Sequence, residues 1–229
     1  MKDFKPSVFV IYGPPGSGKG TQANKIAEKF GFEHFNTGEV IEDTINDPEK
    51  LKDPIVRKQK ENFETGDLCD PAWVSELVSK EIERMHEEGK GIVFSASPRT
   101  LYEAKKIMPL LEDLYGKENI YIFEIVVRPE TSIYRNSHRR VCKDCDYSLV
   151  YTPENEKLKE CPKCGGKLVT RVLDKPEIIK VRINKYIERT KPVYDFLKQR
   201  GFDIYKIDGE PSPEEVEKSI FNKINDKII

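Results

Sequence analysis

Along the chain, short runs of apolar residues alternate with segments in which apolar positions recur every three or four residues. The continuous runs are typical of buried strands, and the three-to-four spacing is typical of amphipathic helices. Strands are expected at Ser7–Tyr12, Gly91–Phe94, Ile120–Val127 and Phe202–Ile207. Helices are expected at Thr21–Phe30, Asp70–Glu88, Thr100–Tyr115 and Glu177–Arg200, and from Ser212 onward. This alternation indicates an α/β fold with a mostly parallel sheet.

Residues at the ends of these segments support the predicted helices. Asp70-Pro71 combines a preferred N-cap residue with proline at the first helical position. Ser212-Pro213-Glu214-Glu215 has the order of a capping box, and Gly31 and Gly201 are placed to end the preceding helices. Two stretches break the alternation: residues 37–67 are helical and polar without a strong strand, and residues 139–173 are irregular and rich in cysteine. We expect both to be lobes inserted into the α/β core.

Composition excludes some classes of protein. The 229 residues are 37% hydrophobic and 10% aromatic, which is enough for a packed core. Lys and Arg (39) almost balance Asp and Glu (40), so bulk charge does not favour binding to nucleic acid or to an anionic membrane. No run is long enough to span a bilayer, and the first residues do not resemble a signal peptide. We therefore expect a cytoplasmic protein, in which five cysteines indicate a metal site or free thiols before disulfides.

A glycine-rich segment lies between the first predicted strand and helix. Gly13-Pro14-Pro15-Gly16-Ser17-Gly18-Lys19 fits the phosphate-binding P-loop, in which glycines let backbone N–H groups surround a phosphate. The helix N-terminus adds positive potential, and Lys19 adds a charge for the transferring phosphoryl group. Gly20 and then Thr21 follow the lysine, so the usual Ser or Thr is displaced by one position.

Four of the cysteines are spaced as metal ligands. Cys142 and Cys145 form one Cys-x-x-Cys pair, and Cys161 and Cys164 form a second. Two such pairs can close a tetrahedral site, and four thiolates leave no open position, so we expect a structural zinc. An iron–sulfur cluster uses similar ligands, and reduced cysteines without a metal are the simplest alternative. Cys69 is expected to be a packed, small apolar residue.

The segment Gly13–Gln22 resembles the P-loop variant of adenylate kinases and related nucleoside monophosphate kinases. Other motifs of that family follow in order: Thr37-Gly38-Glu39, Gly66-Asp67-Leu68, Pro98-Arg99-Thr100, Arg139-Arg140, Arg171, Arg182 and Asp208-Gly209. The resemblance covers essentially the whole chain. It implies a three-layer, doubly wound P-loop core (residues 1–36, 68–138 and 174–229), a helical monophosphate-binding lobe (37–67) and a zinc lid (139–173).

The resemblance also implies a role for each matching residue. The catalytic set would be Lys19, Arg99, Arg139, Arg171 and Arg182. ATP would be bound by Gly13, Gly16, Ser17, Gly18, Lys19, Gly20, Thr21, Arg135, Arg139 and Gly209. The monophosphate would be bound by Thr37, Gly38, Arg99, Glu103, Arg171 and Arg182. Phosphoryl transfer requires positioning and cations more than covalent chemistry, and arginine supplies planar bidentate donors. Arg140, Arg189 and Arg200 are expected to lie at the surface.

Three positions depart from the family pattern. Glu42 stands where the family has an arginine beside the acceptor phosphate, and Ser95 stands where it has an aspartate that holds waters around Mg2+. Glu103 stands where a glutamine reads adenine. A carboxylate only accepts hydrogen bonds, which suits the N1–H and N2–H2 of guanine, unless Glu103 lies on a solvated helix face. Arg57, Lys58 and Lys60 are the candidates to replace the missing arginine, and Glu39 is the candidate to replace the aspartate.

These residues predict a monomeric enzyme that transfers the γ-phosphoryl group of Mg·ATP to AMP. GMP is the alternative acceptor that Glu103 favours, and a degenerate nucleotide-binding protein is the alternative that Glu42 and Ser95 favour. A zinc ribbon that binds nucleic acid is a third possibility, although the lid shows little of the basic and aromatic pattern expected for it. Charge is divided between the lobes. Residues 37–67 carry nine acids and five bases, whereas residues 135–182 carry seven acids and twelve bases.

Overall fold

A computed structural model describes residues 5–95, 97–145, 147–149, 153–170 and 172–228. Its centre is a five-stranded parallel sheet with the order β2-β3-β1-β4-β8. These strands are β1 (Val8–Tyr12), β2 (Glu33–Phe35), β3 (Ile92–Ser95), β4 (Ile120–Val126) and β8 (Ile204–Asp208). The α/β class and the parallel sheet are confirmed. The pattern did not predict β2, because this three-residue edge strand has no continuous apolar run.

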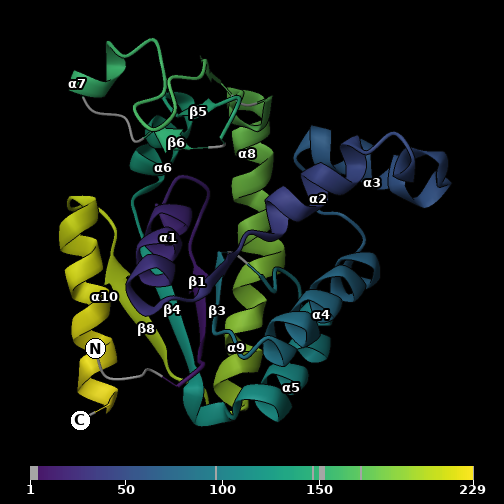
Figure 1. Cartoon of the computed structure of the whole chain (residues 1–229), viewed down its shortest axis with the longest axis vertical. Coiled ribbons are helices and arrows are strands. Elements are labelled where there is room, and N and C mark those ends of the chain that lie inside the picture. Colours follow the sequence, from purple (N-terminus) through teal and green to yellow (C-terminus); the bar gives the residue numbers. More distant parts are fainter. Residues whose placement is uncertain (1–4, 96, 146, 150–152, 171, 229) are drawn as a thin grey trace.

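Side chains of β1 alternate between two apolar layers. Val8, Val10 and Tyr12 join one core cluster, and Phe9 and Ile11 join the other. Helices α1 (Lys19–Phe30) and α10 (Pro213–Ile228) cover the second face. Helices α4 (Pro71–Glu87), α5 (Leu101–Tyr115) and α9 (Lys191–Gln199) cover the first (Figure 1). Parallel sheets require this burial on both faces, which explains why all five residues of β1 are buried.

The stretch at residues 37–67 forms a helical lobe beside the core. It consists of α2 (Thr37–Asn46), a 3-10 turn η1 (Lys50–Lys52) and α3 (Pro54–Thr65). The side chains of Asn36 and Asp53 cap the two helices. Gly66 ends α3 with φ of 81°, and a Cβ there would lie 2.7 Å from Ile178 Cγ2, so the lobe rests directly on the helix that carries Ile178.

The cysteine-bearing stretch forms a small antiparallel sheet with the order β6-β5-β7, above the carboxyl ends of the core strands (Figure 1). The strands are β5 (Arg140–Cys142), β6 (Ser148–Leu149) and β7 (Leu168–Val169). Helix α6 (Pro129–Ser137) leads into it, α7 (Pro153–Glu156) lies within it, and the 3-10 turn η3 (Val172–Asp174) follows it. Its buried cluster consists of Cys142, Leu149, Cys161 and Leu168, a core too small to hold such a lobe without further linkage.

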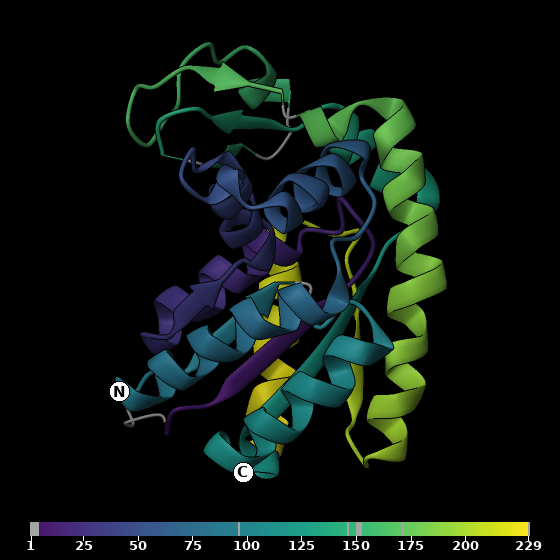
Figure 2. The ribbon, with the colours of Figure 1, turned by 90° about the vertical axis from the view of Figure 1, so that its right-hand side faces the viewer.

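One long helical rod joins this small sheet to the base of the core (Figure 2). It comprises α8 (Pro176–Lys185), a π-helical turn at Tyr186–Thr190 and then α9. The predicted helix over 177–200 is therefore confirmed, with a π turn in its middle. Among the described residues, no helix is long and apolar enough to cross a membrane.

Candidate active site

The glycine-rich loop forms a tight cradle between β1 and α1. Gly13, Gly16 and Gly18 all have positive φ (149°, 76° and 92°). A Cβ at Gly13 would lie 2.6 Å from the carbonyl of Ile125, and one at Gly16 would lie 2.6 Å from the carbonyl of Ser132. Only glycine fits at either position, as a loop that wraps a phosphate requires. Ser17 is buried within the loop, and its hydroxyl has no hydrogen-bond partner among the described residues.

Helix α6 supports this loop from behind. Ser132 Oγ donates a 2.6 Å hydrogen bond to the carbonyl of Pro15, and Asn136, which is fully buried, lies against Gly16. Sequence reasoning missed both residues, because it predicted no helix over 129–137. The local signals were proline at the first helical position and the acidic Glu130 in the first turn.

Three arginines converge on Lys19. Its Nζ atom donates to the carbonyl of Pro14 at 2.7 Å. Burial lowers the pKa of Lys19 well below its ordinary value, and the charges of Arg99, Arg182 and Arg139 lower it further. The structure therefore brings together four of the five residues of the expected catalytic set. The fifth, Arg171, lies outside the described residues.

A buried aspartate holds two of these arginines. Asp174 has no exposed side-chain surface, and its carboxylate accepts from Arg139 Nε at 2.9 Å and from Arg139 Nη2 at 2.5 Å. Arg182 Nη1 lies 3.6 Å from the same carboxylate and donates to the carbonyl of Leu173. Bidentate pairing of this kind fixes a guanidinium in both position and orientation. Sequence reasoning missed Asp174, because the pairing joins residues 35 positions apart.

Arg135 lies against the loop that contains Gly209. Its guanidinium donates to the carbonyl of Gly209 at 2.8 Å and to that of Glu210 at 3.1 Å. The Glu210 carboxylate accepts from the N–H of Arg128 and from the hydroxyl of Thr131, and these contacts hold its pKa at about 2. The two residues expected beside the ATP base are thus in contact with each other.

A narrow pocket opens between the helical lobe and the core. Thr37 and Phe63 line it from the lobe, and Arg99 and Glu103 line it from the core. The Thr37 hydroxyl is buried without a hydrogen-bond partner among the described residues, so it is available to a ligand. A Cβ added to Gly38 would lie 3.9 Å from Arg99 Nη2, which shows that the guanidinium lies at the start of α2.

Glu103 is buried, so the expected alternative of a solvated helix face is wrong. Its side chain is 2% exposed, and burial raises its pKa, although hydrogen bonds from the Arg99 N–H and from Thr100 offset part of this effect. One carboxylate oxygen accepts from the Arg99 N–H at 2.7 Å and the other from the Thr100 hydroxyl at 2.9 Å. The Thr100 hydroxyl in turn caps α5 at the N–H of Glu103.

The basic residues expected to replace the missing arginine are engaged elsewhere. Arg57 donates to the carbonyls of Leu51 and Lys52, Lys58 pairs with Glu61, and Lys60 contacts Asn46. None of these three lines the narrow pocket. Glu42 is half-buried on α2. Lys185 of α8 lies 3.1 Å from Asp67, which lines the pocket.

Ser95, at the end of β3, is bound to a neutral histidine. His34 Nε2 lies 2.8 Å from Ser95 Oγ, and His34 Nδ1 lies 2.5 Å from Asn24 Oδ1. Burial lowers the pKa of His34 to about 4, and the nearby charge of Glu33 only partly opposes this. The end of β3 therefore presents a hydroxyl held by an imidazole in place of a carboxylate. Glu39 accepts a 2.6 Å hydrogen bond from the Asn36 amide.

The four lid cysteines lie together. All four sulfurs are within 4.8 Å of one another, and three of the separations are 3.3, 3.4 and 3.7 Å. A tetrahedral zinc with Zn–S bonds of about 2.3 Å requires sulfurs about 3.8 Å apart. The N–H groups of Asp144 and Lys163 point at Cys142 and Cys161 at 3.4 Å, as in a metal knuckle. The donor set and its size therefore fit zinc.

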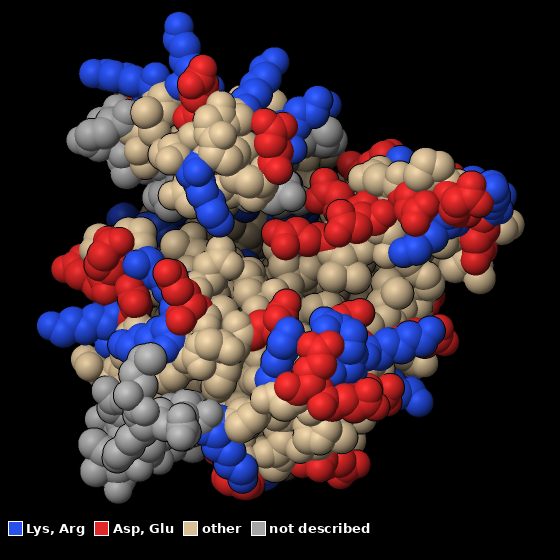
Figure 3. Space-filling view, viewed as in Figure 1, with Lys and Arg blue, Asp and Glu red and all other residues tan. Residues whose placement is uncertain are grey.

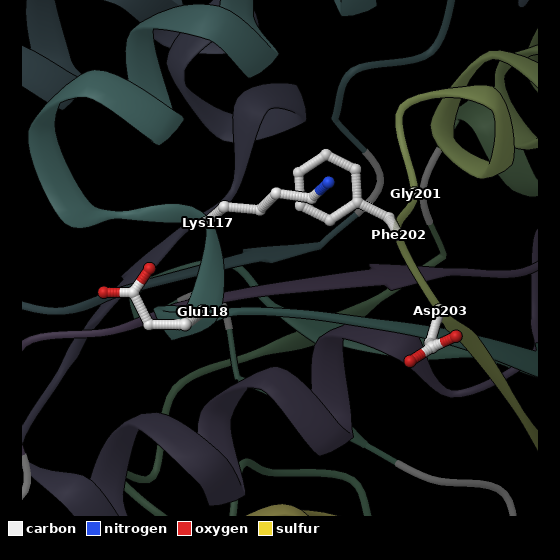
Figure 4. A pocket seen from close by; sticks show the side chains of 5 residues that line it. All are labelled: Lys117, Glu118, Gly201, Phe202 and Asp203. Atoms are coloured by element: carbon white, nitrogen blue, oxygen red, sulfur yellow. The ribbon is translucent and has the colours of Figure 1, made fainter.

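A second hollow lies at the amino ends of the strands, where β4 and β8 begin (Figure 4). Lys117 lies 5.1 Å above the ring of Phe202 and donates to the carbonyl of Arg200. Glu118 and Asp203 complete its rim. Since ligands of open α/β sheets bind outside the carboxyl ends of the strands, this hollow is on the wrong side for nucleotide chemistry.

A parallel sheet with a P-loop at its carboxyl edge, and arginines gathered around the loop lysine, defines a P-loop phosphotransferase. The family model described as Adenylate kinase matches residues 11–202, and the chain belongs to this family. It is therefore a nucleoside monophosphate kinase that uses ATP and a nucleoside monophosphate. An adenylate kinase of Archaeoglobus fulgidus is 34% identical over 93% of this chain and 95% of its own. Adenylate kinases of Oceanobacillus iheyensis (36%; 88% and 91%) and Fervidobacterium nodosum (33%; 93% and 95%) are similarly related.

Proposed function

We propose that the protein transfers the γ-phosphoryl group of Mg·ATP to AMP, giving two ADP. The observation that carries this proposal is the group of Lys19, Arg99, Arg139 and Arg182. Lys19 belongs to the P-loop, the charges of the three arginines lower its pKa, and Arg99 also lines the narrow pocket. A transferring phosphoryl group passes from one side of such a cluster to the other. Its negative oxygens would then be surrounded by fixed cations at every stage.

The site residues form separate groups for ATP, for the acceptor phosphate and for the transferring phosphoryl group, which fits an enzyme with two substrates. Gly13, Gly16, Ser17, Gly18, Gly20 and Thr21 would hold the ATP phosphates, and Arg135 and Gly209 would hold the base side. Thr37, Gly38 and Arg99 would hold the acceptor phosphate. Arg139, Arg171 and Arg182 would clamp the transferring group. These arginines need no proton transfer, because they act through charge and position.

The lobe at 37–67 and the lid at 139–173 would close over the two substrates and exclude water. The space-filling view supports a lobe and a lid that face each other. Acidic side chains gather over α2 and α3, and basic side chains project from the lid across a hollow (Figure 3). A structural zinc bound by Cys142, Cys145, Cys161 and Cys164 would hold the lid sheet together. Removal of water protects ATP from hydrolysis during the transfer.

AMP is the preferred acceptor because the relatives at 31–36% identity are adenylate kinases. GMP was the alternative that Glu103 suggested. Both oxygens of this carboxylate already accept hydrogen bonds from the protein, which weakens its case as a reader of guanine. The retained cation cluster likewise weakens the case for a degenerate protein without turnover.

One assay tests the proposal. The purified chain with Mg·ATP is offered AMP, GMP, CMP, UMP and their deoxy forms, and each diphosphate product is quantified. We expect AMP to give the highest kcat/KM. A higher value for GMP would overturn the choice of acceptor, and absence of product from every acceptor would overturn the kinase function of this chain.

A further inference from the structure

The peptide groups of Arg99 are held from two sides by two different helices. Its N–H donates to Glu103 Oε2 of α5 at 2.7 Å, and its carbonyl accepts from Thr190 Oγ1 of the π turn at 3.0 Å. Both partner side chains are buried, at 2% and 4% exposure. A backbone segment fixed at donor and acceptor alike has little freedom to rotate.

The contact made by Glu103 differs from that of an ordinary capping box. In an ordinary box, the carboxylate at the third helical position accepts from the N–H of the N-cap residue, as Glu215 does from Ser212 at 3.1 Å. Glu103 also stands at the third position, after the N-cap Thr100. Its carboxylate, however, accepts from the residue before the N-cap, which is Arg99. The helix cap is thus extended by one residue to include the arginine of the site.

Thr190 links Arg99 to the helical rod formed by α8, the π turn and α9. It belongs to the same helical rod as Arg182, which lies eight positions earlier in the chain. Arg99 and Arg182 both act on Lys19, as the lowered pKa of that lysine shows. The hydrogen bond from Thr190 therefore connects the backbone of Arg99 to the helical rod that carries Arg182.

We infer that Glu103 and Thr190 are positioning residues that fix Arg99 for the acceptor phosphate, and that Glu103 does not read the acceptor base. This inference rests on the proposed function for its kinetic consequence. Because the guanidinium of Arg99 would contact the phosphate, and every nucleoside monophosphate carries the same phosphate, loosening Arg99 weakens all acceptors alike. A reader of the base, in contrast, changes the ratio between acceptors when it is substituted.

The test uses Glu103→Gln and Thr190→Val in the full chain, with Thr190→Ser as the conservative variant. Gln keeps one acceptor oxygen of two, and Val keeps the shape of Thr without its hydroxyl. Loss of one such hydrogen bond predicts a fall in kcat/KM of about 3- to 10-fold for every acceptor. The KM for ATP and the AMP-to-GMP ratio of kcat/KM stay as in the parent, and Thr190→Ser restores most of the activity.

Glu215→Gln is the matched control, because it removes the same capping chemistry from α10, whose capping pair Ser212 and Glu215 does not line the narrow pocket. It should leave the kinetics unchanged. A second measurement needs no activity: hydrogen exchange of the Arg99 amide should be faster in Glu103→Gln than in the parent and unchanged in Glu215→Gln.

A change of about tenfold in the AMP-to-GMP ratio for Glu103→Gln would overturn the inference and make Glu103 a base reader. Unchanged exchange of the Arg99 amide would also overturn it. If the parent chain transfers no phosphoryl group to any acceptor, the proposed function fails, while the exchange measurement still decides whether Glu103 fixes Arg99.

Discussion

The guanidinium of Arg139 forms a bidentate pair with the buried carboxylate of Asp174, with N–O distances of 2.9 and 2.5 Å. Arg182 lies 3.6 Å from the same carboxylate. One fully buried acid thereby orients two arginines that would clamp the transferring phosphoryl group. Substitution of Asp174 is therefore expected to affect catalysis through the two arginines.

Asp174→Asn should lower kcat by about 10-fold or more, because the two arginines lose the charge that orients them. The KM for AMP should rise as well, because Arg182 is among the residues expected to bind the monophosphate. Steady-state kinetics with varied AMP and ATP measures both quantities. A variant with parental kcat would show that the arginines are oriented by other groups.

Arg139→Ala should destabilise the fold by about 2–3 kcal/mol, since among the described residues it leaves the buried carboxylate of Asp174 with only Arg182, at 3.6 Å, as a cationic partner. The double variant Arg139→Ala/Asp174→Ala should be more stable than Arg139→Ala alone. Urea unfolding of Arg139→Ala, Asp174→Ala and the double variant, compared with the parent, gives the coupling energy between the two side chains. Additive effects would contradict a direct interaction.

The lid should contain one zinc per chain, measured by elemental analysis of the purified protein. Cys142→Ser should lose the metal and expose the lid to proteolysis, because its small apolar cluster cannot order the segment alone. Cys69→Ala is the control for zinc content, as Cys69 is buried outside the cluster and burial raises its pKa to about 11. Iron in place of zinc, or full activity without metal, would contradict the assignment.

His34 should make the stability of the protein depend on pH. Its pKa is about 4 in the folded chain against an ordinary value of 6.5, so the unfolded chain binds the proton more readily. Stability attributable to His34 is therefore fully present above pH 6.5 and is lost as the pH falls from 6.5 towards 4. The free energy of unfolding at pH 7 and pH 5 should differ less in His34→Gln than in the parent. Equal differences in the two proteins would refute this.

Glu42→Arg should raise kcat/KM for AMP by about 10-fold or more, because a cation replaces an anion on the helix that begins at the acceptor pocket. Glu49→Arg makes the same change in net charge at an exposed position of the lobe and serves as its control. Equal gains in the two variants would indicate a general effect of charge.

Ser95→Asp should raise turnover, since it restores a carboxylate at the carboxyl end of β3, where the family holds the waters around Mg2+. The effect should be largest at low Mg2+ concentration. Titration of Mg2+ at fixed ATP separates this gain from a change in ATP affinity. The same substitution should raise the pKa of His34, which already contacts position 95 at 2.8 Å.

Local patterns predicted the elements whose chemistry is contained in a short segment. The P-loop and the two Cys-x-x-Cys pairs are examples, because their spacing in sequence already fixes their geometry. Glu103 shows a signal that was present and missed: Thr100-x-x-Glu103 has the same order as the capping box recognised at Ser212–Glu215. Sequence alone could not predict the roles of Asp174, Ser132 and Thr190. Each contacts a residue more than 30 positions away, and no local pattern indicates such a contact.

The cation cluster around Lys19 brings like charges together in the folded chain, and a bound polyanion would neutralise them. Burial lowers the pKa of Lys19 most, and repulsion from the charges of the three arginines lowers it further. The phosphates of a bound nucleotide would oppose this repulsion and would therefore raise the pKa of the lysine. A nucleotide that binds the folded chain and not the unfolded chain would therefore also raise the thermal stability of the protein.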